Sequence, residues 1–183
     1  MNTFLIVSFG MFAGMLFVPG PGDRQSANPS VAALHTHNEF RFKVQAPMAV
    51  AAPLFGASEE RVWAPDWNPQ FVQPVPPKDE LGAVFKILHP GGIEATWIMT
   101  AADFAGGHVQ YVYVIPEAMT TLIDIHLSEE SKGVTSVHVV YERTALRPAA
   151  NAHVQHFADG DARQGPEWES AITSYLARRS PHQ

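Results

Sequence analysis

The chain has 183 residues, of which 46% are hydrophobic and 16% charged, and its net charge is −6 with the histidines neutral. This composition is typical of one folded domain and excludes a largely disordered chain. A mildly acidic chain is not expected to bind nucleic acid or an anionic membrane surface. Because the sequence contains no cysteine, disulfides, thiolate catalysis and zinc ligation by cysteine are excluded.

The N-terminal region is apolar and is followed by a linker. Residues 4–18, FLIVSFGMFAGMLFV, are shorter than the roughly 20 residues of a membrane-spanning helix. They have the length of the apolar core of a signal peptide, although no Lys or Arg precedes them and no clear cleavage site follows. We therefore predict that residues 1–33 are a leader and linker, acting as an export signal or short membrane anchor. The alternative is a cytoplasmic protein whose reading frame starts further downstream.

The folded domain is predicted to cover residues 34–183 and to begin with a strand. Residues 35–44 alternate between apolar and polar side chains at their end, which predicts a strand. Residues 46–63 predict two short helices separated at Gly56, the second capped by Ser58. Residues 63–77 hold five prolines and cannot stay regular for long, yet they carry three large aromatic residues. We expect this segment to pack against the domain.

Five strand-like runs follow, joined by links short enough for antiparallel neighbours. They are residues 82–89, 93–101, 108–115, 119–127 and 134–143. This spacing predicts an antiparallel meander, with the first strand closing one side.

A helix pattern is strongest at the C-terminus, in residues 164–179. Apolar residues at i, i+3, i+4, i+7 and i+8 form one stripe: Trp168, Ala171, Ile172, Tyr175 and Leu176. Pro166 suits the first position of this helix. Residues 147–157 also show a helical pattern, and Asp159–Asp161 interrupt it, so the sequence predicts either one broken helix or two helices. The sheet is the obvious cover for the apolar stripe, which predicts an α+β fold.

This order of elements and several motifs resemble the START-like superfamily called SRPBCC, which includes polyketide cyclase/dehydrase-like proteins and pollen-allergen-type ligand carriers. The motifs are E-x-x-W-x-P-x-W-N-P-x-F at Glu60–Phe71, the strand Gly82–Phe85, Trp97, Tyr141-x-x-Thr144-Ala145-Leu146, and Trp168-Glu169 with Tyr175-Leu176. The resemblance covers roughly residues 34–176 and implies a helix-grip fold. In that fold a curved antiparallel sheet of six or seven strands surrounds a long C-terminal helix, with two short helices after the first strand. The resemblance also implies a hydrophobic cavity between sheet and helix, and it carries over no catalytic residue.

Large apolar side chains on these elements are the candidates for the wall of a ligand cavity, with ordinary core packing as the alternative for each. They are Trp63, Trp67, Phe71, Phe85, Trp97, Tyr111, Tyr113, Tyr141, Trp168, Ile172 and Tyr175. The candidates for acid–base chemistry are His108, Asp124 and His126, and the alternative is that they are polar residues of a solvated sheet face. Their spacing matches no known metal motif, so neither a metal nor another cofactor is predicted.

The resemblance favours binding or transport of a small hydrophobic molecule, lipid or polyketide-like, in the cavity between sheet and helix. One alternative is a polyketide cyclase or dehydratase that uses buried acid–base residues. A second alternative is a protein-interaction module whose cavity is filled by side chains. Membrane contact is predicted only through the leader.

Overall fold

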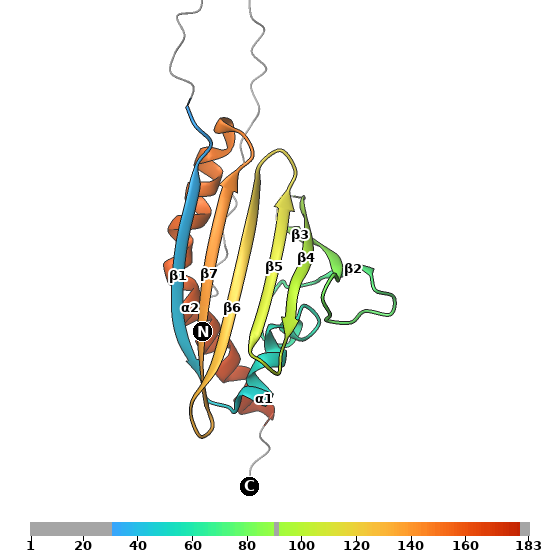
Figure 1. Ribbon diagram of the computed structural model, residues 1–183, viewed down its shortest axis with the longest axis vertical. Helices are drawn as coiled ribbons and strands as arrows, with labels where there is room; N and C mark the ends of the chain where they lie inside the picture. Colours follow the sequence, from blue (N-terminus) through green and yellow to red (C-terminus); the bar gives the residue numbers. More distant parts are fainter. Residues whose placement is uncertain (1–30, 90–91, 180–183) are drawn as a thin grey trace, which may run out of the picture.

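A computed structural model describes residues 31–89 and 92–179 as one antiparallel sheet and one long helix (Figure 1). The strands are β1 (His35–Val44), β2 (Gln70–Gln73), β3 (Val84–His89), β4 (Ile93–Asp103), β5 (His108–Ile115), β6 (Met119–Ser131) and β7 (Val134–Ala145). Their order across the sheet is β1-β7-β6-β5-β4-β3-β2, and all neighbours are antiparallel. The predicted meander, closed on one side by the first strand, is therefore confirmed. The predicted leader, residues 4–18, lies outside the described residues.

The helices are short after β1 and long at the C-terminus. They are α1 (Met48–Ala51), η1 (Ala52–Phe55), η2 (Glu59–Val62), η3 (Pro148–Ala150) and α2 (Asn151–Arg179). Ser58 was expected to cap the second short helix, but its side chain makes no cap hydrogen bond. Its backbone N–H instead donates to the Asp79 carboxylate at 3.0 Å. No helix among the described residues is long and apolar enough to cross a membrane.

The sheet has two chemically different faces because successive side chains of a strand point to opposite sides. In β5, β6 and β7 buried residues alternate with more exposed ones along each strand, apart from the exposed end of β6. We call the face that carries Tyr111, Ile123 and Val139 the inner face, and the face that carries His108 and Asp124 the outer face. The inner face is covered by α2 and the short helices, whereas Figure 1 looks onto the outer face.

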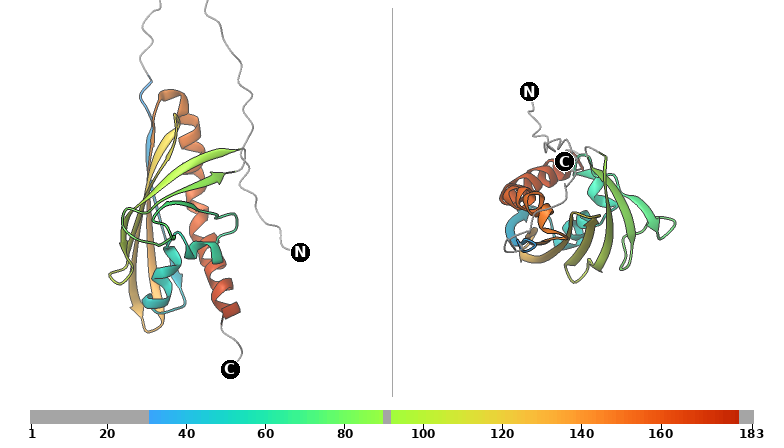
Figure 2. Two further views of the ribbon diagram at one scale, coloured as in Figure 1. Left: turned by 90° about the vertical axis from the view of Figure 1, so that its right-hand side faces the viewer. Right: turned by 90° about the horizontal axis from the view of Figure 1, so that it is seen from above.

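The sheet is bent around the helix. The pairing register shifts between Met99 and Ala101 in β4, and again between Glu129 and Ser131 in β6. Such irregularities bend a strand and increase its twist. Figure 2 shows β3 and β4 curving out of the plane of the other strands, toward the side on which α2 lies.

The C-terminal helix α2 is one continuous helix, which corrects two expectations. Asp159–Asp161 do not interrupt it, and Pro166 lies inside the helix and not at its first position. Pro166 removes one backbone hydrogen bond, whose acceptor is the carbonyl of Ala162. Both residues are exposed, so this carbonyl can bond to water.

A glycine sets the distance between α2 and β1. Gly165 is buried, and a Cβ atom added to it would lie 3.1 Å from Cδ2 of Phe40. A methyl group here requires Phe40 to shift by a few tenths of an ångström, and a larger side chain would crowd the contact between helix and strand. The close packing of α2 on β1 depends on this residue.

A buried ion pair joins α2 to the sheet. Nη1 of Arg143 on β7 lies 2.5 Å from Oδ2 of Asp161 on α2, and both side chains are 2% exposed. The Asn38 amide on β1 donates to the same carboxylate oxygen at 2.9 Å. The guanidinium lies over the ring of Tyr141, 4.2 Å from its centroid, and the Tyr141 hydroxyl donates to Gln164 of α2. Three elements are thus tied together in the protein interior.

Gly165→Val is expected to lower the free energy of unfolding by about 1–3 kcal/mol, because its methyl groups collide with Phe40. Urea denaturation measures the change. The matched control is Gly160→Val on the same helix, where the nearest atom to an added Cβ is Arg163 Nη2 at 3.7 Å. The control should be neutral or slightly stabilising, since valine has the higher helix propensity. Equal losses in the two variants would contradict this account.

Asp161→Ala is expected to lower the free energy of unfolding by about 3–5 kcal/mol, because it leaves the Arg143 guanidinium buried without its carboxylate. Arg143→Met should cost a similar amount. The double variant Arg143→Met/Asp161→Ala should cost much less than the sum, since no unpaired charge remains. Urea denaturation of all three variants gives the coupling free energy. Asp159→Ala, at an exposed position of α2, should stay within about 0.5 kcal/mol of the wild type.

Candidate functional site

A groove opens where the last turns of α2 meet α1 and η1. Its main hollow measures about 470 Å³, and a second hollow of about 250 Å³ shares the lining residues Gln45 and Leu176 with it. We call the two hollows together the terminal groove. The apolar lining consists of Ala46, Pro47, Ala49, Val50, Pro53, Leu54, Leu176 and Ala177. The small side chains of the alanines leave space that larger residues would fill.

Polar groups in the lining give the groove an electrostatic direction. They are Gln45, Glu59 and Arg179 in the main hollow and Thr173 in the second hollow. The Arg179 guanidinium is held in place by donating to the Tyr175 hydroxyl at 3.0 Å. The volume lies within the range of small-molecule sites, but the groove is open to solvent along much of its extent.

The residues predicted to form the ligand wall lie on the inner face or on the segments that cover it. Seven are buried: Trp63, Phe85, Trp97, Tyr111, Tyr113, Tyr141 and Ile172. Four are partly exposed: Trp67, Phe71, Trp168 and Tyr175. None of the eleven is among the residues that line the terminal groove. Their contact with a ligand stays a prediction.

Most of these aromatic rings pack against one another in two clusters. One surrounds Trp168 of α2, whose ring centroid lies 5.5 Å from that of Trp63 and 5.6 Å from that of Phe40. The other surrounds Trp97 of β4, which stacks on Tyr113 at 4.2 Å and meets Trp67 edge-on at 5.2 Å. The rings therefore fill much of the space in which the sequence predicted a cavity.

Glu60 is a buried carboxyl group that was not among the candidate residues from the sequence. Burial, together with the nearby charge of Asp79, raises its pKa to about 8. Burial, together with the charges of Glu60 and Asp79, also raises the pKa of Tyr111, whose hydroxyl donates to the Phe55 carbonyl at 2.7 Å. Glu60 is thus protonated at neutral pH. Periodicity could not reveal this, because η2 has only four residues and its neighbour Glu59 is exposed.

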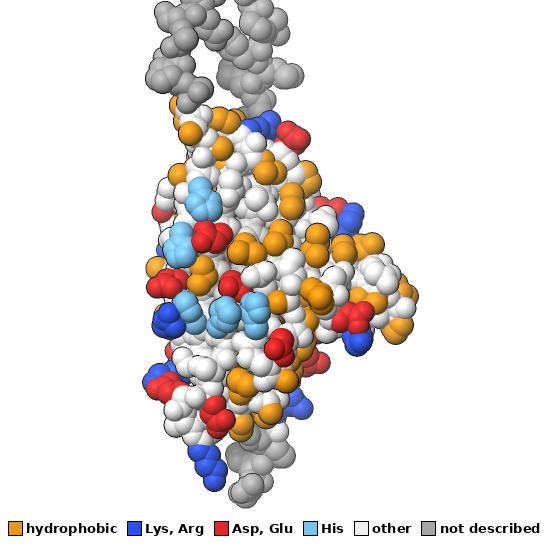
Figure 3. All heavy atoms as spheres, in the orientation of Figure 1, with side chains coloured by type: hydrophobic (Ala, Val, Ile, Leu, Met, Phe, Trp, Pro, Cys, Tyr) orange, Lys and Arg blue, Asp and Glu red, His pale blue; other side chains and the backbone are white. Residues whose placement is uncertain are grey.

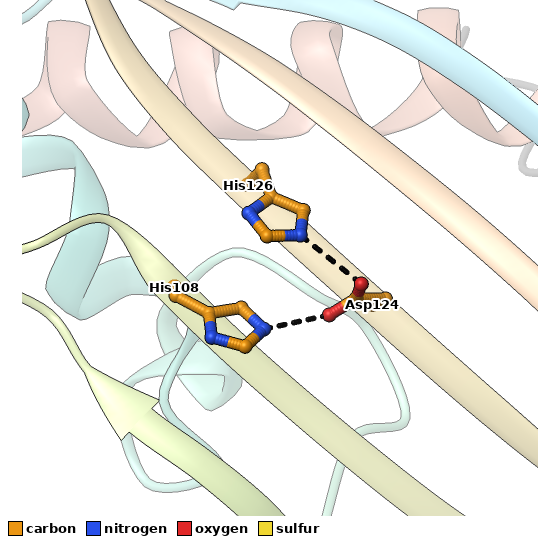
Figure 4. A group of neighbouring side chains, drawn as sticks. All are labelled: His108, Asp124 and His126. Carbon is orange, nitrogen blue, oxygen red and sulfur yellow. Dashed lines mark hydrogen bonds and ion pairs between the residues drawn. The ribbon is translucent and has the colours of Figure 1, made fainter.

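The predicted acid–base residues do come together, but on the outer face (Figure 4). Nε2 of His108 lies 2.7 Å from Oδ1 of Asp124, and Nε2 of His126 lies 3.0 Å from Oδ2. Burial acts to raise the pKa of Asp124, but hydrogen bonds from His108, Gln110 and His126 outweigh it and hold the pKa below its usual value. Because the sheet separates this cluster from α2, it cannot act on a molecule bound at the inner face.

Other histidines share the outer face and pair with carboxylates. His35 and His37 both contact Glu142, at 2.8 and 2.6 Å, and His138 contacts Glu39 at 2.7 Å. The hydrogen bond with Glu142 raises the pKa of His37. Figure 3 shows histidine side chains gathered on this face, over the strands from β1 to β5.

Comparisons with known proteins place the fold. No family model matches the sequence, and no curated protein matches it. Among solved structures, norcoclaurine synthase from Thalictrum flavum, in complex with dopamine and hydroxybenzaldehyde, has 11% sequence identity and a TM-score of 0.61. That likeness covers 93% of this chain and 100% of the synthase.

Two further solved structures are similar. Ara h 8.0201 has 15% identity and a TM-score of 0.60, covering 79% of this chain and 99% of its own. The major latex-like protein 151 from Panax ginseng has 15% identity and a TM-score of 0.55, and the likeness covers 81% of this chain and 99% of the ginseng protein. These likenesses confirm the helix-grip fold that the START-like resemblance implied. At such low identity they show the fold alone.

Glu60→Gln tests the buried proton through the pH dependence of stability. The folded protein holds this proton up to about pH 8, whereas the unfolded chain releases it near the ordinary pKa of 4.5. Wild-type stability should therefore fall as pH rises through this window, by up to about 1.4 kcal/mol per pH unit. The variant loses this contribution, so its stability relative to the wild type should increase from pH 5 to pH 8.

Urea denaturation at pH 5, 6.5 and 8 measures the two slopes. Glu59→Gln is the matched control, because that carboxylate is exposed, and it should keep the wild-type slope. An unchanged slope in Glu60→Gln would show that Glu60 is ionised in the folded protein.

Proposed function

We propose that the protein binds or carries a small hydrophobic molecule, lipid or polyketide-like, in the terminal groove. The observation that carries the proposal is the apolar lining of a hollow of about 470 Å³ with few polar groups. Affinity comes from removing apolar ligand surface from water, at about 25 cal/mol per Å² before the costs of ordering. Arg179 and Gln45 supply polar partners for one end of the ligand.

The proposed site lies at one end of the space in which the sequence placed the ligand. The sequence predicted a cavity between the sheet and the C-terminal helix. Leu54, which lines the terminal groove, also contacts the ring cluster, since the Trp63 indole donates to its carbonyl at 2.6 Å.

The similar solved structures support a small-molecule site in this fold. Norcoclaurine synthase was solved with dopamine and hydroxybenzaldehyde bound, so the same arrangement of sheet and helix accommodates small aromatic molecules in that protein. An enzyme is accordingly the first alternative for this chain, and the protonated Glu60 is the acid it would use. Glu59, however, lines the groove, whereas Glu60 faces Asp79 and Tyr111.

The packed rings favour a second candidate, a protein-interaction module whose interior serves stability. Large apolar residues are exposed around β2 and β3: Val72, Val75, Leu81 and Leu88. Scattered exposed apolar residues are common on protein surfaces. This observation therefore supports a protein-interaction module less strongly than the groove supports ligand binding. The binding experiment below separates the two functions.

Titration with the apolar dye N-phenyl-1-naphthylamine, with dodecanoic acid as competitor, tests the ligand site. The wild type should bind the dye with increased fluorescence, and the fatty acid should displace it. Val50→Arg places a charge in the apolar lining and should weaken binding about tenfold or more, a loss of about 1.4 kcal/mol.

The matched control is Leu88→Arg, which changes an exposed apolar residue of β3 away from the groove. It should bind the dye as the wild type does. Native mass spectrometry of the purified protein adds an independent search for a co-purified ligand. Equal binding by Val50→Arg, or no dye binding and no co-purified molecule in the wild type, would refute the proposal.

A further inference from the structure

The outer face carries a compact group of possible metal ligands that the groove does not explain. His108 on β5 and His126 on β6 are directly paired across the two strands. Asp124 precedes His126 by two residues and therefore points to the same face. The two imidazole rings lie parallel, 3° apart in orientation and with centroids separated by 4.5 Å. Figure 4 shows one ring nitrogen of each histidine directed toward the Asp124 carboxylate, which lies beside the two rings.

The distances within this group suit a single metal ion. One ligand atom from each of the three side chains can be chosen so that all lie within 4.8 Å of one another. In a tetrahedral zinc site, two bound nitrogen atoms lie about 3.4 Å apart, given the usual Zn–N distance. The side chains must therefore rotate before both imidazoles and the carboxylate share one coordination sphere.

We propose that His108, Asp124 and His126 form a binding site for a late first-row divalent cation, with Zn²⁺ as the representative ion. The two imidazoles coordinate through Nε2 and Asp124 through a carboxylate oxygen. Water completes a tetrahedral set. Nitrogen and carboxylate ligands in this number are those of a zinc site with one open position.

The surroundings hold the ligands in place. β5 and β6 are internal strands of the sheet, so each is fixed by hydrogen bonds on both sides. The Gln110 amide donates to Oδ1 of Asp124 at 3.0 Å, and the Thr100 hydroxyl in turn donates to Gln110 at 2.9 Å. Such supporting hydrogen bonds orient metal ligands in known sites. The three side chains are 25–53% exposed, which leaves a path for an ion from solvent.

A second pair of histidines on the same face serves as an internal comparison. His35 and His37 also flank a carboxylate, Glu142, but His35 is engaged by Thr144 as well, at 2.9 Å. Across residues 31–89 and 92–179, no other group of three histidine, aspartate or glutamate side chains brings its ligand atoms within 4.8 Å of one another. The geometry therefore singles out the β5–β6 cluster. This site lies across the sheet from α2, and the inference does not depend on the proposed ligand function.

Isothermal titration of the full chain with zinc chloride, in a buffer free of chelators, tests the inference. One ion should bind per chain with a Kd below about 100 µM. His126→Gln and Asp124→Asn should each weaken binding about tenfold or more, the size of effect expected when one of three protein ligands is lost. His37→Gln, a histidine of the same face outside the cluster, should bind zinc as the wild type does.

Two further measurements keep the test decisive. Circular dichroism and the zinc-free Tm show whether each variant is folded. If His126→Gln does not fold, Asp124→Asn still tests the site. Cobalt(II) should give the visible absorption of a four-coordinate nitrogen–oxygen site in the wild type, and this absorption should be lost in His108→Gln. Absence of saturable binding, or equal weakening by His37→Gln and His126→Gln, would overturn the assignment.

Discussion

The contact between α2 and the edge formed by β1 and β7 determines the rest of the architecture. It combines an opposite-charge pair, Arg143 and Asp161, with the close approach that Gly165 permits to Phe40. A buried pair of this kind contributes less to net stability than its short distance suggests, because both charges lose their hydration. Its effect is positional, since any shift of the helix would separate two charges in an apolar interior. The helix therefore has one favourable placement on the sheet.

That placement decides where small molecules can be accommodated. While α2 lies over β1 and β7, Trp67 packs on Phe85 and Trp97 of β3 and β4, and the Tyr111 hydroxyl of β5 donates to the Phe55 carbonyl. The rings pack on each other around Trp97 and Trp168, and free volume is left where the helix ends beside α1. The terminal groove is thus a consequence of packing one long helix and the short helices after β1 onto one curved sheet.

The sheet also keeps two kinds of chemistry apart. Alternation along β5 and β6 sends Tyr111 and Ile123 inward and His108 and Asp124 outward. An apolar ligand at the inner side and a cation at the outer side would therefore not compete. The two faces of each strand are chemically independent, as the period of two requires. The fold supplies the two surfaces, and the side chains determine the chemistry of each.

The sequence by itself determined six of the seven strands and their order, whereas the short strand β2 lies in the segment that was not expected to stay regular for long. The first strand, residues 35–44, and the fifth, residues 108–115, have the predicted bounds, because periodicity and turn residues act locally. The START-like resemblance added the way in which they assemble. Tertiary structure alone decided that Asp161 turns inward to meet Arg143, that Glu60 is buried, and that His108 faces His126. A sequence pattern indicates which side of an element a residue faces. Burial and strand register depend on partners far along the chain, so these features could be read only from the tertiary structure.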